Sequence, residues 1–329
     1  MVDDNAIAIN HFMNVASFGA LEKINCALCN RDKTRLVTVQ KWFGVEFHVV
    51  RCVYCNLIFT NPRPTEEWKE KLYDAQYNPV MKRDRRKFLY LPPPHRNYMH
   101  KRLIEFLINK VGSEKTLLDG GCAGGQFVKL ACENGFNASG FEFSSEAIAY
   151  AREQFNLTLI RADAANIPVP DNSYDIITLL QVFEHFRDPI GTLKELKRIL
   201  KPRGILLIET VNYLKLYLLE TYFPFLKSLY LRTVRKDLSS FWAGTLPWFP
   251  FDHYYHWTPK TLLTVLRKAD FEQCQTHFIS NYLSGSQQMD PLRLLHLRKR
   301  YNDMIRFFLR ISDDRLNLWG ALIATAEKS

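Results

Sequence analysis

Four of the seven cysteines fall into two close pairs whose spacing is typical of a metal-binding site. Cys26 and Cys29 bracket two residues, Cys52 and Cys55 bracket two more, and residues 30–51 lie between the pairs. One turn can present both sulfurs of a pair to an ion, and two such turns complete a tetrahedral thiolate site, which suits structural Zn²⁺. The sequence therefore predicts an N-terminal zinc-ribbon module with these four cysteines as ligands.

The residues between the cysteine pairs predict a β-hairpin. Residues 33–40 and 45–51 are rich in β-branched and aromatic side chains and flank Gly44. The remaining cysteines stand apart from the pairs, and we expect each of them to be a small, buried apolar residue. They are Cys122, Cys132 and Cys274.

A change of pattern near residue 65 divides the chain. Asn61-Pro-Arg-Pro64 ends the region of short strands, and the residues that follow have helical periodicity. Short apolar runs then alternate with helical segments, which predicts a parallel sheet covered on both faces. The predicted domains are 1–65 and 66–329, the second with inserts near 212–256 and 281–318. The predicted strands of the second domain are 116–119, 138–142, 159–162, 175–180 and 205–209, and its predicted helices are 66–77, 100–111, 127–134 and one that begins at Thr258.

A glycine-rich turn, Asp119-Gly-Gly-Cys-Ala-Gly-Gly125, connects the first of these strands to a helix. Glycine tolerates positive φ and lets a ligand approach the backbone closely, and open α/β sheets bind ligands at such turns. The glycine pattern of dinucleotide-binding turns fails here, because Ala123 and Gln126 hold its second and third positions when the count starts at Gly121.

The spacing instead resembles the first motif of class I S-adenosylmethionine-dependent methyltransferases, in which an acidic residue is followed by glycines at every second position. In this chain the acidic residue is Asp119, and Ala123 replaces the second of the three glycines. Three more segments match this family in order: 140–144, 161–168 and 171–189, followed by a proline-glycine turn at 200–204. The resemblance implies a Rossmann-like sheet, mostly parallel with its last strand antiparallel, and S-adenosylmethionine as cofactor.

The same resemblance implies which residues hold the cofactor. Glu142 ends the second strand, where an acid can accept hydrogen bonds from both ribose hydroxyls. Asp163 is expected to receive the adenine amino group, and Ala164 to offer its backbone N–H. The expected cofactor-binding residues are Asp119, Gly121, Ala123, Gly125, Glu142, Phe143, Asp163, Ala164 and Gln181.

Glu184 and His185 follow the predicted fourth strand, on the side where the reactive methyl group would lie. Methyl transfer from a sulfonium is an in-line displacement, so the protein has to position the acceptor and remove its proton. Histidine, with an unperturbed pKa of about 6.5, is suited to that task. We expect His185 to be the base, with Glu184 beside it and His253 as a rival base. The alternative, that His185 only caps the next helix or bonds within its loop, stays open.

The whole arrangement resembles a group of bacterial methyltransferases. They combine a four-cysteine ribbon, an Asn-Pro-Arg-Pro segment, a Glu-His pair after strand four and a His-x-x-x-aromatic-Ser/Thr segment, here His253, Trp257 and Thr258. Sugar C-methyltransferases of this group use the histidine of the pair in catalysis. Many other members are thought to modify surface polysaccharides or secondary metabolites, so the resemblance implies a role in carbohydrate or secondary-metabolite biosynthesis. The sugar C-methyltransferases have an additional C-terminal domain that we do not expect in this chain, so the resemblance does not imply C-methylation.

The two predicted inserts give information on the methyl acceptor and on the location of the protein in the cell. Residues 213–250 are rich in aromatic side chains and are expected either to cap the substrate pocket or to form a packing layer. Residues 290–311 predict a basic amphipathic helix, which either packs on its own domain or lies on a membrane surface. No signal-peptide pattern and no membrane-spanning apolar run is present, so we expect a cytoplasmic protein, membrane-associated only through 290–311.

The formal net charge of +10 favours anionic partners. The expected acceptor is a small molecule, a sugar or a lipid-linked glycan. A ribosomal RNA methyltransferase is the first alternative, since such enzymes can also carry an N-terminal zinc site and a basic surface suits RNA, although their zinc motif usually has different spacing. A non-catalytic, methyltransferase-like binding module is the second alternative, and the presence of Glu142, Asp163 and His185 argues against it.

Overall fold

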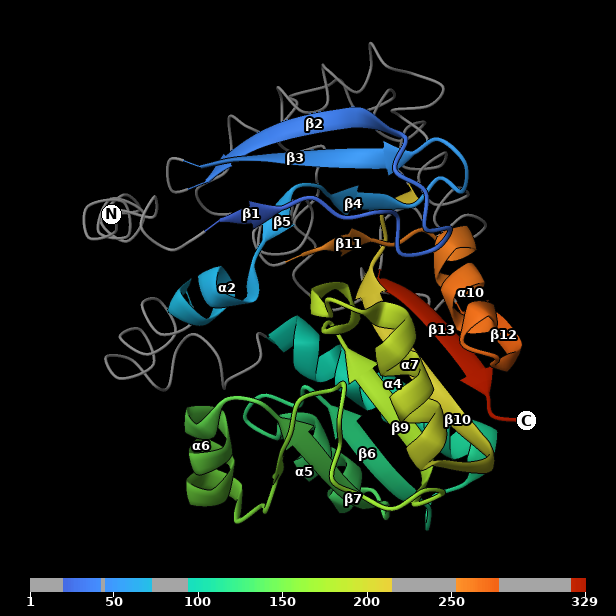
Figure 1. Cartoon of the computed structure of the whole chain (residues 1–329). Helices are drawn as coiled ribbons and strands as arrows, with labels where there is room; N and C mark the ends of the chain where they lie inside the picture. Colours follow the sequence, from blue (N-terminus) through green and yellow to red (C-terminus); the bar gives the residue numbers. More distant parts are fainter. Residues whose placement is uncertain (1–19, 43–44, 73–93, 215–252, 278–320) are drawn as a thin grey trace, which may run out of the picture.

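Two β-sheets meet in the structure, a computed structural model that describes residues 20–42, 45–72, 94–214, 253–277 and 321–329. A seven-stranded sheet flanked by helices is capped at one end by a four-stranded sheet, three strands of which come from the N-terminal region (Figure 1). Within the described residues, no helix has the length and apolar character needed to cross a membrane. Segment 290–311 and most of the insert near 212–256 lie outside the described residues, so the expectations for both stay predictions.

The large sheet has the strand order β12-β13-β10-β9-β6-β7-β8. Its strands are β6 (Thr116–Gly120), β7 (Asn137–Glu142), β8 (Ile160–Arg161), β9 (Tyr174–Leu180), β10 (Leu200–Val211), β12 (Glu272–His277) and β13 (Ala321–Glu327). The five strands from β8 to β10 pair in parallel, whereas β13 pairs antiparallel with both β10 and β12. The mostly parallel Rossmann-like sheet with an antiparallel last strand is therefore confirmed.

Successive residues of the central strands enter opposite hydrophobic cores. Leu118 and Ile177 belong to one core, whereas their chain neighbours Leu117 and Ile176 belong to the other. Side chains alternate along a strand, so burial on both faces requires continuously apolar strands. This is the physical basis of the pattern that predicted a covered parallel sheet.

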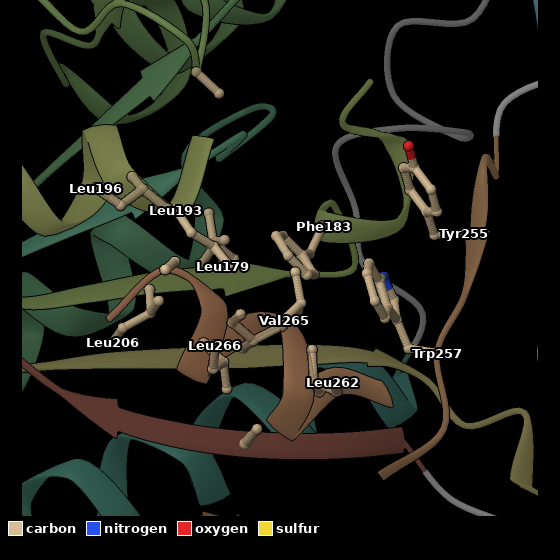
Figure 2. Packing of buried hydrophobic residues seen from close by; sticks show 14 of the residues in the cluster. Leu179, Phe183, Leu193, Leu196, Leu206, Tyr255, Trp257, Leu262, Val265 and Leu266 are labelled. Carbon is tan, nitrogen blue, oxygen red and sulfur yellow. The ribbon is translucent and has the colours of Figure 1, made fainter. Parts of the chain in front are cut away.

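Helices cover both faces of this sheet. They are α4 (Pro94–Val111), α5 (Gln126–Glu133), α6 (Ser145–Phe155), α7 (Pro189–Ile199) and α10 (Pro259–Lys268), with a short 3₁₀ helix η3 (Phe183–His185) after β9. Figure 2 shows leucines of α7 and α10 beside the sheet, and Phe183 next to Trp257. The rings of Phe183 and Trp257 stack with their centroids 5.1 Å apart. Helix α10 begins where the sequence predicts, because the Thr258 side chain accepts a hydrogen bond from the Thr261 amide.

The N-terminal sheet has the order β11-β4-β3-β2, with every pairing antiparallel. Its strands are β2 (Thr34–Trp42), β3 (Val45–Cys52), β4 (Ile58–Thr60) and β11 (Tyr255–His256), and nearby β1 (Leu21–Glu22) pairs with β5 (Arg63–Pro64) before helix α2 (Glu66–Leu72). The predicted hairpin is β2–β3, but strand β11 comes from the second domain. Leu57 and Phe59 also share a hydrophobic core with Trp257 and Leu262. The domain boundary near residue 65 stays a prediction. The residues before and after it contribute strands to the same four-stranded sheet and side chains to the same hydrophobic core.

The expectation of buried character holds for Cys122 but is wrong for the other two isolated cysteines. Cys132 is exposed and Cys274 is half-buried. Cys132 follows the buried Ala131 on α5, so it lies on the outer side of the helix, and Cys274 lies on β12, an edge strand of the described sheet. Small size and weak polarity do not by themselves decide on which side of an element a cysteine lies.

Candidate functional site

The four paired cysteines converge on one point. Cys26 Sγ lies 3.3 Å from Cys55 Sγ, and Cys29 Sγ lies 3.5 Å from Cys52 Sγ. All four sulfur atoms lie within 4.8 Å of one another. Four thiolates bound to one Zn²⁺ at about 2.3 Å would lie about 3.8 Å apart, so the cluster has the dimensions of a tetrahedral site.

The same backbone turn presents each cysteine pair. The Asn30 amide donates to the Cys26 carbonyl at 2.8 Å, and the Asn56 amide donates to the Cys52 carbonyl at 3.1 Å. Both asparagines have positive φ, 56° and 64°, a region that asparagine tolerates better than most residues. The two Cys-x-x-Cys-Asn segments therefore form equivalent knuckles.

The cysteine cluster favours ionisation of one sulfur. The side-chain hydrogen bond with Cys26 lowers the pKa of the Cys55 thiol to about 5, and the same contact raises the pKa of Cys26. A thiol must lose its proton to bind a metal, so an easily formed thiolate suits this role.

The glycine-rich turn lies at the carboxyl end of β6. Gly121, Ala123 and Gly125 have φ values of 62°, 46° and 78°. A Cβ atom at Gly121 would lie 2.5 Å from Val182 Cγ2, so the turn contacts the loop after β9 and only glycine fits there. Ala123 adopts the left-handed region as well, which shows that alanine at this position does not prevent the turn.

Glu142 ends β7, and three backbone amides hold its carboxylate. Oε2 accepts a hydrogen bond from Ala123 N at 2.9 Å, and Oε1 accepts from Phe143 N at 2.8 Å and from Ser144 N at 2.9 Å. A carboxylate has about four acceptor sites, so Glu142 can still accept from a ligand hydroxyl. Beside it, Phe143 is 59% exposed and offers an apolar ring to a flat ligand. These residues fit the ribose and adenine of S-adenosylmethionine.

Two further predicted cofactor residues support neighbouring strands. Asp119 is buried and accepts a hydrogen bond from Thr178 Oγ1 at 2.6 Å, which links β6 to β9. Gln181 has a φ of 58° and donates from Nε2 to Glu209 Oε1 at 3.0 Å, which links the end of β9 to β10. Both therefore have structural contacts that shape this edge of the sheet.

Asp163 and Ala164 follow β8 at the same edge. The Ala162 amide donates to the Glu142 carbonyl at 3.2 Å, so this loop adjoins the end of β7. Asp163 Oδ1 accepts from Ala165 N at 2.8 Å, and Ala164 is buried. The structure thus brings the ends of β6, β7 and β8 together, as the sequence predicts.

Glu184, His185 and His253 form a second cluster beyond the carboxyl end of β9. One donor atom from each residue lies within 4.8 Å of the others. The two imidazole rings meet edge to face with centroids 4.6 Å apart. Glu184 is buried, and its Oε2 accepts a hydrogen bond from Thr210 Oγ1 at 2.8 Å. Such a group can transfer a proton, and its donor set is also one that divalent cations accept.

Burial keeps two histidines near this cluster neutral. Loss of solvation lowers the pKa of His253 well below its usual value, and the nearby His185 and His256 lower it further. Burial lowers the pKa of His256 to about 3. Tyr213 joins the group, with its hydroxyl oxygen 3.5 Å from His253 Nδ1 and its ring 4.6 Å from that of His256. His253 can therefore serve His185 as an uncharged neighbour at neutral pH.

We expect the protein to lose stability as the pH falls below about 6.5. His256 has an ordinary pKa of 6.5 in the unfolded chain and about 3 in the folded chain, so between these values the unfolded state binds more protons. The free energy of unfolding should then fall by about 1.4 kcal/mol per pH unit for this group. Urea unfolding from pH 7 to pH 4.5 should show a shallower decline for His256→Gln than for the wild type. Equal slopes would contradict the neutral buried histidine.

The sequence did not single out Thr210 or Arg187, and it indicated Tyr213 only as the first residue of the aromatic insert 213–250. Thr210 and Tyr213 lie at the carboxyl end of the fifth predicted strand, an edge where parallel sheets collect ligand-facing residues, and that position was a usable signal. Arg187 contacts Glu22 and Pro64, which are distant in the sequence. No local spacing indicates that contact.

The part of the chain that forms most of the large sheet has recognisable relatives. Residues 94–276, more than half of the chain, match the model of a family described as a methyltransferase domain. The ubiquinone biosynthesis O-methyltransferase of Actinobacillus pleuropneumoniae serotype 7 (strain AP76) is 29% identical over 116 residues, which cover 32% of this chain and 50% of that protein. A probable S-adenosylmethionine-dependent methyltransferase of Mycolicibacterium smegmatis is 29% identical over 99 residues, covering 30% of this chain and 38% of that protein.

The chain thus spans about half the length, or less, of these curated relatives. The crystal structure of a SAM-dependent methyltransferase from Archaeoglobus fulgidus superposes with a TM-score of 0.47 at 17% identity, over 77% of this chain and 100% of that chain. The match to the family model covers the glycine-rich turn, Glu142 and the Glu184-His185 pair. The chain belongs to the methyltransferase-domain family, the S-adenosylmethionine-dependent methyltransferases with this Rossmann-like fold.

Proposed function

We propose that this protein transfers a methyl group from S-adenosylmethionine to a hydroxyl of a small-molecule or carbohydrate acceptor, with His185 as general base. The observation that carries the proposal is the contact between the glycine-rich turn and the loop after β9. Gly121 lies against Val182, and His185 follows in the same loop. Residues suited to hold the cofactor and residues suited to deprotonate an acceptor therefore lie at the same edge of the sheet.

Residues at the ends of β7 and β8 would hold the cofactor. Glu142 would accept hydrogen bonds from the ribose hydroxyls, Phe143 would cover the adenine, and Asp163 would receive the adenine amino group. When bound, S-adenosylmethionine supplies the electrophilic methyl group. The contribution of the protein is then to fix the acceptor hydroxyl and to remove its proton.

His185 is the favoured base because of what surrounds it. Glu184, adjacent in the chain and held by Thr210, places a carboxylate beside the imidazole group. His253, kept neutral by burial, adds no opposing charge. Burial disfavours a proton on His253, so the proposal assigns the role of base to His185.

The proposed acceptor class follows from chemistry and from relatives. A relative with 29% identity is named for methyl transfer to oxygen. The net charge of +10 suits acceptors that carry phosphate, such as sugar nucleotides or lipid-linked sugars. Resemblance to enzymes that modify carbohydrates and secondary metabolites favours the same class, and we place this protein in carbohydrate biosynthesis on that basis.

We further propose that the four clustered cysteines hold one structural zinc ion. Four thiolates fill the tetrahedral coordination of Zn²⁺, so such a site leaves no open position for a substrate. The metal would stabilise the N-terminal sheet and take no part in methyl transfer.

A screen with methyl-labelled S-adenosylmethionine tests the proposed reaction. Sugar nucleotides, lipid-linked sugars, phenols and ribosomal RNA are offered separately, and calorimetry measures cofactor binding. We expect label on a hydroxyl oxygen of a carbohydrate or other small molecule. Label in RNA, with salt-sensitive RNA retention, would assign the protein to the RNA methyltransferases. Absence of cofactor binding would make it a non-catalytic module.

We expect Glu142→Ala to weaken cofactor binding by about 1.5 to 3 kcal/mol, roughly 10- to 150-fold in Kd, because a charge-assisted acceptor is lost. Titration calorimetry with S-adenosylmethionine measures the change. Glu142→Gln retains an acceptor oxygen and should lose less. Glu133→Ala, on the exposed end of α5, is the matched control. Unchanged affinity in Glu142→Ala would refute the ribose assignment.

A further inference from the structure

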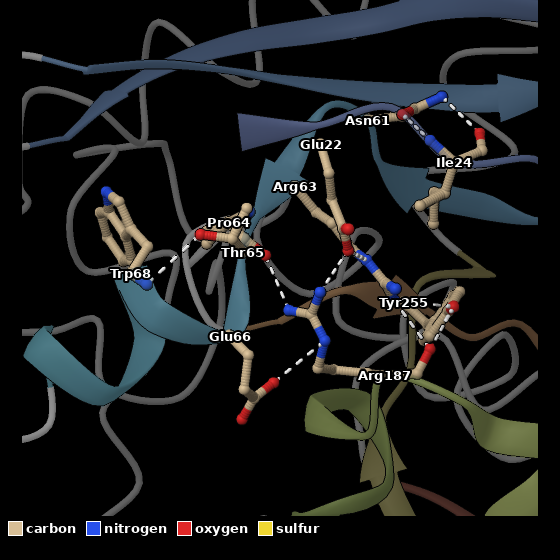
Figure 3. A network of polar contacts seen from close by, with 10 residues as sticks. All are labelled: Glu22, Ile24, Asn61, Arg63, Pro64, Thr65, Glu66, Trp68, Arg187 and Tyr255. Atoms are coloured by element: carbon tan, nitrogen blue, oxygen red, sulfur yellow. Dashed lines mark hydrogen bonds and ion pairs between the residues drawn. The ribbon is translucent and has the colours of Figure 1, made fainter. Parts of the chain in front are cut away.

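The loop that carries His185 is fastened to the N-terminal region by Arg187. This guanidinium pairs with Glu22 and, through Nε, with Glu66 Oε2 at 3.0 Å, and it donates from Nη1 to the Pro64 carbonyl at 2.7 Å. Figure 3 shows these contacts converging on Arg187 from β1, β5 and the start of α2. All three nitrogens of the fork are thus engaged by residues before position 67.

Arg63 completes the link from the opposite side. Its Nε donates to Glu22 Oε1 at 2.8 Å, so Glu22 lies between two arginines (Figure 3). Its Nη1 donates to the Arg187 carbonyl at 2.7 Å, and that carbonyl also accepts from the Tyr255 hydroxyl at 3.0 Å. Arg63 of the N-terminal region therefore binds the backbone of the loop that carries His185. Arg187 of that loop binds residues 22, 64 and 66 of the N-terminal region.

The same region supports the backbone of His253. Thr60 of β4 donates from Oγ1 to the His253 carbonyl at 3.1 Å and from its amide to the Tyr254 carbonyl at 3.0 Å. The Tyr254 amide in turn donates to the Glu184 carbonyl at 2.9 Å. A chain of backbone contacts therefore runs from β4 through His253-Tyr254 to the Glu184-His185 pair.

Arg63 and Arg187 both contact the side chain of Tyr254, whose backbone belongs to this series of hydrogen bonds. The guanidinium carbons of Arg63 and Arg187 each lie 5.6 Å from the centre of its ring. Cations at this distance are attracted to the ring face. The two arginines thus brace the residue that immediately follows His253.

We propose that Arg63 and Arg187, joined by Glu22, are positioning residues that set the mutual placement of His185 and His253. The proposal rests on the proposed function for its catalytic meaning. The physical reason is that two rings meeting at 4.6 Å need both of their loops fixed, and here the same N-terminal segment fixes both. The N-terminal region then acts on the proposed reaction through the placement of these two histidines.

The test uses full-length protein labelled with ¹⁵N-histidine, so that ring signals of His185 and His253 report their environment without any acceptor. Glu22→Gln removes the shared charge, and Arg63→Lys keeps a charge but loses the forked donor geometry. The matched control is Glu195→Gln, since Glu195 pairs with Arg198 at 2.7 Å outside this network. Single His185→Asn and His253→Asn variants assign the signals.

We expect both test variants to shift the ring signals of His185 and His253, and Glu195→Gln to leave them in place. Affinity for S-adenosylmethionine should stay within about twofold, while kcat with an identified acceptor should fall about tenfold and Glu22→Asp should restore part of it. Ring signals identical to those of the wild type in both Glu22→Gln and Arg63→Lys would overturn the proposal. If no acceptor is ever methylated, the proposed function fails, and the ring signals still decide the positioning claim. Should Glu22→Gln not fold, Arg63→Lys gives the same reading.

Discussion

The His185→Asn variant should retain its fold and its affinity for S-adenosylmethionine while turnover falls by about 100-fold or more, the usual effect of losing a general base. Asparagine keeps a polar side chain of similar reach but cannot accept a proton at neutral pH. Because His185 is one of two histidines in ring contact, the residual rate should depend on His253. Steady-state kinetics with the identified acceptor, together with cofactor calorimetry, measure the effect.

Two further variants make the result specific to the proposed base. His48→Asn changes an exposed histidine on β3 and should leave turnover unchanged. His253→Asn removes the buried neighbour and should lower turnover less than His185→Asn. Near-normal turnover in His185→Asn combined with a large loss in His253→Asn would assign the base to His253 and give His185 a structural role.

The Cys52→Ser variant should lose its zinc and become less stable by more than about 4 kcal/mol, a loss typical of removing a structural metal. A serine hydroxyl does not replace a thiolate in a four-sulfur site. Cys52 is fully buried and shares a hydrophobic core with Phe59 and Trp257, so the damage should extend beyond the cysteine knuckle. Elemental analysis and urea unfolding at pH 7 measure both effects.

Cys132→Ser is the matched control for the zinc prediction. Cys132 is exposed on α5 and lies outside the cluster, so this variant should keep about one zinc per chain and wild-type stability. Cofactor affinity of Cys52→Ser should persist where the protein still folds, because Glu142 and the glycine-rich turn lie on other elements. Freshly purified wild-type protein without zinc would refute the structural metal.

Local patterns predicted most of the large sheet and the residues at its edge. Runs such as Ile176–Leu180, in which every residue except Thr178 is apolar, predict a strand covered on both faces without reference to distant partners. The glycine-rich turn follows from the need for positive φ at Gly121 and Gly125. A strand-end acid such as Glu142 is likewise visible from its place after a predicted strand.

Contacts between distant segments could not be predicted in the same way. The motif places Asp119 among the cofactor residues, but only the structure shows that it is buried against Thr178. The ring contact of His185 with His253 depends on how the chain returns after residue 252, which no spacing encodes. Strand β11 has only two residues, and it pairs with β4, which lies far from it in the sequence. A local sequence pattern therefore could not predict this pairing.

The pairing of β4 with β11 also has a consequence for biosynthesis. The ribosome makes residues 58–60 long before residues 255–256, and at typical synthesis rates the interval is on the order of ten seconds or more. During that interval the outer edge of β4 has unpaired backbone groups and buried-type side chains such as Phe59 exposed to other chains. We therefore expect a chain that ends before residue 255 to be more prone to aggregation than the full-length chain, because this strand edge stays open.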